Sequence, residues 1–187
     1  LALFFIIFAQ PTIYLVSGKL FERAIVPMEI IMPTLLLIGL SNITGIQILI
    51  PMGKEKYVLY SEIAGAIVNL IINGILIPRL GASGAAIGTV SAELVVLMYQ
   101  MWVLRKDLGK LFGGVQIWKI MIAVVLSAIA AAAVRRSSLS TFFMLILGGI
   151  VFFMVYGIIL LILKESVVCE YLNTGKGYVN KILKKKH

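Results

Sequence analysis

The stretch YVLYSEIAGAIVNLIINGILIPRLGASGAAIGTVSAELVVLMYQMWVL, residues 57–104, decides the fold of this chain. Two apolar segments, residues 57–77 and 83–104, flank a short connection that contains Pro78 and Gly81. Each segment has the roughly 20 helical residues that cross a bilayer, whereas a spanning strand needs about half that length and alternates polar with apolar residues. Because the connection is tight, we expect an antiparallel helical hairpin in a membrane.

Four further apolar segments lie around this hairpin, at residues 1–17, 26–50, 117–134 and 141–163. The chain is 61% hydrophobic and only 13% charged, and its mean hydropathy is +1.07. A soluble domain with so few charged residues could not cover such a core, so the bilayer is the expected solvent. We therefore predict an all-α, polytopic transmembrane helical bundle of about six spans over residues 1–163, followed by a basic tail at residues 164–187.

The charge balance and the rare residue types narrow the function. The chain carries 17 Lys and Arg against 8 Asp and Glu, a net charge of +9. Because the bases lie between apolar runs and at the C-terminal end, anionic membrane lipids are the expected partner, and nucleic acid is not. The only cysteine is Cys169 and the only histidine is His187, so we expect no internal disulfide, no metal site, no cofactor and no histidine-dependent catalysis.

The bases also predict an orientation. If six spans alternate across the membrane, one side receives the loops around Lys54 and Arg105 together with the tail, and it holds twelve of the 17 bases. The other side receives the connection at Arg79 and the remaining loops. Cytoplasmic loops carry an excess of Lys and Arg, so the C-terminus is predicted inside and Arg79 outside.

Several polar side chains lie inside the predicted spans, where they are costly and need a partner or a role. Their spacing by four or seven residues places some of them on shared helix faces. One interpretation is a water-accessible cavity that binds the polar head of a substrate or an ion. The other interpretation is hydrogen bonding between packed helices. Glu62 lies near a membrane end, so we expect its carboxylate to reach the membrane–water interface. The candidate cavity residues are Glu93, Asn69, Asn73, Gln47, Thr89 and Gln100.

Two prolines, Pro11 and Pro33, interrupt apolar segments. A proline removes one backbone hydrogen bond and bends a helix, which membrane proteins tolerate where neighbouring groups satisfy the freed carbonyl. We therefore predict a bend at each proline. The pattern leaves open whether such a bend is static or moves during transport.

Four motifs between residues 45 and 100 carry a family resemblance. They are a Gln-x-Leu-Ile-Pro-x-Gly-Lys turn at 47–54, an Asn-x-x-x-Asn pair at 69–73, an Ile-Pro-x-x-Gly turn at 77–81, and a Gly-Ala-Ala-Ile-Gly-Thr…Glu run at 84–93. In order and spacing they resemble the polysaccharide repeat-unit flippases, which are O-antigen, capsule and exopolysaccharide transporters of the multidrug/oligosaccharidyl-lipid/polysaccharide exporter superfamily. The resemblance covers about the first 110 residues, and the last two helices match only in type. Leu20-Phe21 lacks the glycine that usually follows in that family.

The resemblance implies a two-lobe transporter in the bacterial cytoplasmic membrane. Its substrate would be an undecaprenyl-pyrophosphate-linked oligosaccharide, moved by alternating access for the synthesis of lipopolysaccharide or another surface polysaccharide. This chain would be the C-terminal part and supply most of the second lobe, with the missing N-terminal lobe as its partner. The start at Leu1, inside an apolar run, agrees with that expectation. No substrate-binding residue carries over from the family.

Other functions compete with this hypothesis. Within the same superfamily, a lipid II flippase or a cation-coupled drug antiporter is an alternative, and an antiporter would use an intramembrane carboxylate such as Glu93. A membrane-embedded glycan-modifying enzyme would need a cluster of His, Asp or Arg at a membrane face. Arg135 and Arg136 have no acid or histidine nearby in sequence, so we expect a protein that is not an enzyme. Polar faces on adjacent helices argue weakly against a structural subunit.

Overall fold

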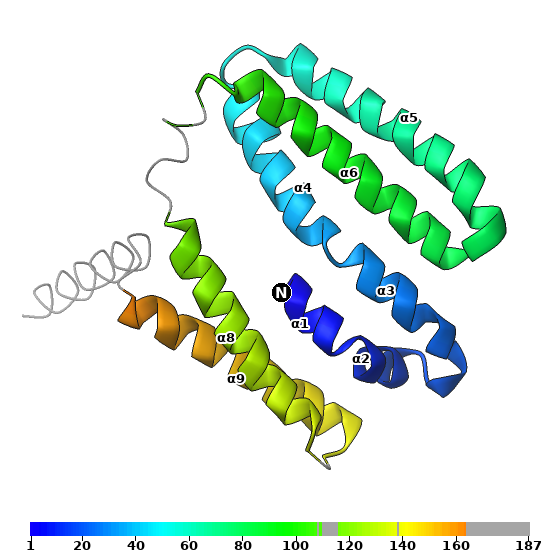
Figure 1. Cartoon of the computed structure of the whole chain (residues 1–187), viewed down its shortest axis with the longest axis vertical. Helices are drawn as coiled ribbons and strands as arrows, with labels where there is room; N and C mark the ends of the chain where they lie inside the picture. Colours follow the sequence, from blue (N-terminus) through cyan, green and yellow to red (C-terminus); the bar gives the residue numbers. More distant parts are fainter. Residues whose placement is uncertain (108, 110–115, 138, 164–187) are drawn as a thin grey trace, which may run out of the picture. The chain divides into compact units, whose positions relative to one another are not determined.

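The computed structural model describes residues 1–107, 109, 116–137 and 139–163, and the regular elements in this part of the chain are all helices (Figure 1). Five helical stretches are long and apolar enough to cross a membrane. The predicted all-α membrane bundle is therefore confirmed. The predicted basic tail at residues 164–187, with Cys169 and His187, lies outside the described residues.

The chain divides into two compact units, which are described separately. The first unit contains the helices from α1 to α6. It begins with two short helices, α1 (Ala2–Ile7) and α2 (Ala9–Val16), in place of a single helix over residues 1–17. Neither has the length that a span requires.

The second apolar segment, predicted as one helix over residues 26–50, is a series of shorter helices. A 3-10 helix, η1 (Lys19–Ala24), leads into α3 (Ile25–Ile31), and α4 (Thr34–Asn42) follows. A two-residue break at Met32 and Pro33, where a bend was predicted, separates α3 from α4. Pro33 has no N–H, so it cannot donate the usual helical hydrogen bond. Its carbonyl accepts from the backbone N–H of Leu36 at 3.0 Å, a bond that spans three residues and not the four of an α-helix.

A π-helix, η2 (Ile43–Leu49), ends this broken span. The backbone N–H of Ile50 donates to the carbonyl of Gly45 at 3.0 Å, five residues back. The chain then turns through Gly53, whose φ of 68° lies in the left-handed region that glycine adopts without a steric penalty. The prediction of one regular helix missed this wider turn.

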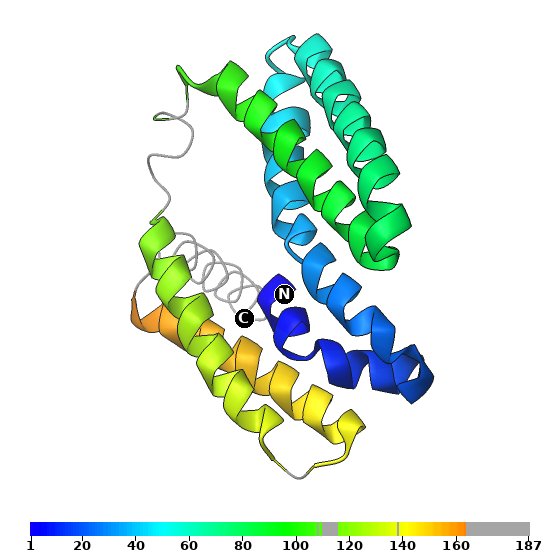
Figure 2. The ribbon, with the colours of Figure 1, turned by 45° about the vertical axis from the view of Figure 1, so that its right-hand side comes forward.

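The predicted hairpin is confirmed. Helix α5 (Glu55–Leu80) and helix α6 (Ala82–Leu104) run antiparallel and lie side by side (Figures 1 and 2). The reversal occurs at Gly81, which has a φ of 56° and whose N–H donates to the carbonyl of Ile77 at 2.9 Å. Helix α5 continues through Pro78, where the sequence predicted that the turn begins.

Small residues let the two helices approach closely. At Gly84 an added Cβ would lie 2.5 Å from the carbonyl oxygen of Leu76, and at Gly65 it would lie 2.6 Å from Cγ2 of Val96. Small side chains at a spacing of four are a common way to pack membrane helices. On its other side α6 contacts α3 and α4, so it is the central helix of this unit (Figure 2). The residues of α6 that recur every four positions and are buried are Gly84, Gly88, Ala92, Val96, Gln100 and Leu104.

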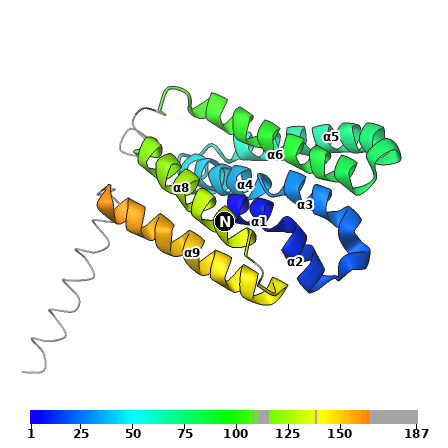
Figure 3. The same cartoon turned by 60° about the horizontal axis from the view of Figure 1, so that its bottom comes forward.

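The second unit contains α8 (Ile117–Arg135) and most of α9 (Thr141–Ile162). A short connection joins these helices, and they run in opposite directions (Figure 3). Their bounds agree with the predicted segments at 117–134 and 141–163. Hydropathy alone was sufficient here, because both helices have high mean hydropathy and their few charged residues lie near the ends of α8.

Candidate functional site

A fully buried polar cluster joins three helical elements of the first unit. Thr44 of η2 and Ser61 of α5 have no exposed surface, and Gln100 of α6 is 1% exposed. The Thr44 hydroxyl lies 2.5 Å from Oε1 of Gln100, and Nε2 of Gln100 lies 3.1 Å from the Ser61 hydroxyl. Gln100 therefore bridges the π-helix to α5.

The hydrogen bonds in this cluster run in one direction, from Thr44 through Gln100 and Ser61 to the backbone of α5. A separation of 2.5 Å suits an O–H···O bond, and 3.1 Å suits an N–H···O bond. Thr44 thus donates to Gln100, and the Gln100 amide donates to Ser61. Ser61 in turn donates to the carbonyl of Val58 at 2.6 Å. Thr44, Gln100 and Ser61 each have a hydrogen-bond partner, as buried polar groups require.

The π-helix contributes to the shape of this cluster. Gly45 follows Thr44, and a Cβ added to it would lie 3.1 Å from Nε2 of Gln100. The absence of a side chain at Gly45 therefore leaves room for the amide. The carbonyl of Leu40 lies 3.0 Å from the Thr44 hydroxyl and offers it a second acceptor. Such wide turns occur often at functional sites.

Asn69 and Asn73 lie at the packed interface between α5 and α6. Nδ2 of Asn73 donates to Oδ1 of Asn69 at 2.5 Å, a bond within α5. Gly88 of α6 faces both side chains, and a Cβ added there would collide with Oδ1 of Asn73. Oδ1 of Asn73 is buried and has no hydrogen-bond partner among the described residues. The two side chains therefore pack against α6, but their hydrogen bond lies within α5 and does not join the two helices.

The other three candidate residues do not join either group. Glu93, near the middle of α6, is half-buried, and no base in the described part of the chain forms an ion pair with it. The Thr89 hydroxyl donates to the carbonyl of Ala85 in its own helix at 3.1 Å. Gln47 is exposed on the π-helix, and Glu62 is exposed on α5. The six candidates therefore do not converge on one cavity.

The candidate residues predicted from the sequence included neither Ser61 nor Thr44. A signal for Ser61 exists in the sequence, because Ser61, Gly65, Asn69 and Asn73 recur every four residues along α5. No such signal pairs Thr44 with Gln100, since 56 residues separate them.

The cluster consists of neutral hydroxyl and amide groups. These groups donate and accept hydrogen bonds, but they carry no charge to transfer. In the described residues no group of three or more His, Cys, Asp or Glu is placed to hold a metal ion. The arrangement is therefore suited to holding helices together or to binding a polar group.

Comparison of the chain with protein-family models, with curated proteins and with solved structures found no match.

Proposed function

We propose that this multi-pass membrane protein is the C-terminal part of a flippase that moves undecaprenyl-pyrophosphate-linked oligosaccharides across the bacterial cytoplasmic membrane. The observation that carries the proposal is the broken second span. The stretch Lys19–Leu49 is apolar, yet it is interrupted at Pro33 and ends in a π-helix. Discontinuous helices of this kind are common where transporters bind and move their substrates.

The broken span supports a mechanism of alternating access. The hydrogen bonds from Thr44 through Gln100 to Ser61 connect the π-helix to the α5–α6 hairpin, and in the proposed cycle these three elements move together as one rigid body. The break at Pro33 lacks a full set of helical hydrogen bonds and is the natural hinge. In the proposed cycle, α3 tilts about this hinge while the rigid body stays intact.

A cation-coupled antiporter of the multidrug/oligosaccharidyl-lipid/polysaccharide exporter superfamily is a second candidate. It is favoured by Glu93, a carboxylate near the middle of a span. A carboxylate in the middle of a span is costly unless it has a partner or a functional role. Within the described residues Glu93 has no ion-pair partner, so its carboxylate is available to bind a transported cation or a proton. The same side chain would serve a flippase that is driven by an ion gradient.

Complementation tests the two candidates. We expect the full-length gene to restore surface polysaccharide to a flippase-deleted bacterium that makes a matching glycan. Glu93→Gln removes the charge with little change in shape, and we expect it to reduce the restored polysaccharide at least tenfold if ion coupling drives transport. The measurement is surface polysaccharide per cell, with the amount of inserted protein measured by immunoblot.

Asn73→Leu is the matched comparison for Glu93→Gln. Asn73 lies in a helix interface, and leucine removes its polar atoms while keeping the number and branching of its side-chain heavy atoms, so we expect this variant to keep most of the polysaccharide. If wild type fails to restore polysaccharide despite good expression and a matched glycan, the flippase proposal is wrong. Drug resistance that depends on Glu93 would then support the antiporter.

The orientation also gives a testable prediction. We expect the turn at Arg79 to lie outside and the loop at Lys106 to lie inside, because the bases are concentrated on the Lys106 side. In a Cys169→Ser background, an impermeant maleimide added to intact cells should label Arg79→Cys and should label Lys106→Cys only after lysis. The reverse pattern would contradict the proposed topology.

A further inference from the structure

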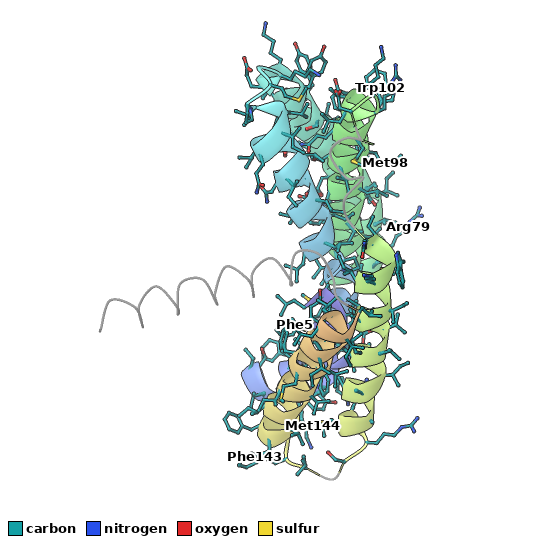
Figure 4. The ribbon with its side chains drawn as sticks, turned by 90° about the vertical axis from the view of Figure 1, so that its left-hand side faces the viewer. Phe5, Arg79, Met98, Trp102, Phe143 and Met144 are labelled. Carbon is teal, nitrogen blue, oxygen red and sulfur yellow. The ribbon has the colours of Figure 1, made fainter. Side chains whose placement is uncertain are left out.

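A pocket of about 290 Å³ lies at the end of the α5–α6 hairpin that is remote from Gly81. Lys54 and Tyr57 line it from the start of α5, and Trp102, Val103, Arg105 and Lys106 line it from the end of α6 and just beyond. Three bases from two segments about 50 residues apart in sequence therefore converge, and among the described residues no acid lines the pocket. Figure 4 shows Trp102 at this end of α6 and Arg79 at the other end of the hairpin.

The placement of Lys54 points to an anionic ligand. Arg105 and Lys106 follow the C-terminus of α6, where positive charge offsets the negative end of the helix dipole. The helix dipole does not explain the position of Lys54. It is the N-cap of α5 and makes no side-chain capping bond, so it adds positive charge where the backbone N–H groups already make the potential positive. Glu55, in the first turn of α5, offsets part of this charge but does not line the pocket.

The aromatic residues place the pocket at the membrane surface. Tyr57 and Trp102 are 40% and 58% exposed, and both lie at the ends of apolar helices, where aromatic side chains gather at the level of lipid headgroups. The Arg105 guanidinium lies 4.9 Å from the centroid of the Trp102 ring, so the ring holds this cation in position at the pocket.

We propose that this pocket binds the phosphate group of an anionic membrane lipid. Its volume is at the lower end of ligand pockets, which suits a headgroup and not a whole lipid. Met98 lies one turn before Trp102 on the same face of α6 and is 62% exposed, so an acyl chain can run along this face (Figure 4). The proposal does not depend on the flippase function.

Trp102 provides a direct probe of the pocket. The chain has two tryptophans, so Trp118→Phe leaves Trp102 as the only one. The complete chain would be reconstituted in bilayers of phosphatidylcholine with increasing brominated phosphatidylglycerol, and separately with brominated phosphatidylcholine. Bromine quenches a nearby tryptophan, so the two curves give the relative affinity of the two lipids beside Trp102. We expect clear preference for phosphatidylglycerol.

Lys54→Gln tests the assigned cation without changing the segment that carries the probe. A base near an anionic surface contributes enough that its loss should lower the preference about fivefold. Arg79→Gln removes the same charge from the other end of the same hairpin and should leave the preference unchanged. The proposal is overturned if both lipids quench equally in the parent protein, or if the two variants lower the preference by the same factor.

Soluble phosphate distinguishes the source of the anion. Inorganic phosphate at the ionic strength of a sodium chloride control should screen the preference no more than chloride does. If phosphate abolishes the preference and chloride does not, the pocket binds free phosphate, and the assignment to a lipid is wrong.

Discussion

Replacing Gly84 with leucine is expected to destabilise the first unit by about 3 kcal/mol, because the added side chain meets backbone that cannot rotate away. A Cβ at this position would lie 2.5 Å from the carbonyl oxygen of Leu76 and 2.9 Å from the backbone nitrogen of Ile77. Relief requires α5 and α6 to separate, which loosens contacts along the whole hairpin. The measurement is an SDS titration in micelles that follows Trp102 emission in the Trp118→Phe background.

Gly74→Leu is the matched control for this substitution. Gly74 lies in the same hairpin, on α5, and a Cβ added there meets nothing within 4 Å. Leucine forms helix more readily than glycine, so we expect no loss and a gain of up to about 1 kcal/mol. Equal destabilisation by Gly74→Leu and Gly84→Leu would show that close packing at Gly84 does not hold the hairpin together.

The contrast between these two glycines shows what the sequence can predict. The hairpin itself was predictable, because two apolar runs of spanning length flank a tight turn. The run of small residues at the start of α6 is also typical of close packing between membrane helices. The sequence could not show which glycines of the hairpin face the partner helix, since the direction of a helix face toward its neighbour is a tertiary property.

The broken second span also has one feature that the sequence predicts and one that it does not. Pro33 lacks an N–H, so the break between α3 and α4 follows from local chemistry, and the sequence predicted an irregularity at this residue. The π-helix at Ile43–Leu49 was not, because its wide turn has no proline or other local signal. It places Thr44 against Gln100, a contact across 56 residues. Periodicity singled out Gln100 as a candidate cavity residue, but it could not identify the partners that enclose it.

Replacing Gln100 with glutamate is expected to destabilise the first unit by about 3–5 kcal/mol, the range for an uncompensated buried charge. The side chain is 1% exposed, so a carboxylate there would lose its hydration. Thr44 could still donate to one carboxylate oxygen. The Ser61 hydroxyl, which accepts from Nε2 of Gln100, would face a second acceptor and could donate to it only by leaving the carbonyl of Val58.

Gln100→Leu separates the effect of charge from the loss of hydrogen bonds. Leucine fills a similar volume, and the two hydroxyls keep backbone acceptors, Thr44 at Leu40 and Ser61 at Val58. Since no donor is orphaned, we expect a loss of only about 0.6–1.7 kcal/mol, as for other hydrogen bonds between membrane helices. The same SDS titration measures both variants, with Gln116→Glu as a control for an added charge at an exposed N-cap.

Comparing the stability losses of Gln100→Glu and Gln100→Leu shows whether the Thr44–Gln100–Ser61 cluster is dry or solvated. A larger loss for glutamate than for leucine means that Gln100 is enclosed and dry, so the π-helix and the hairpin move as one body, as the proposed hinge at Pro33 requires. If glutamate is tolerated as well as leucine, water reaches Gln100 in the folded protein. The cluster would then line a solvated cavity, and the rigid body on which the hinge mechanism depends would not exist.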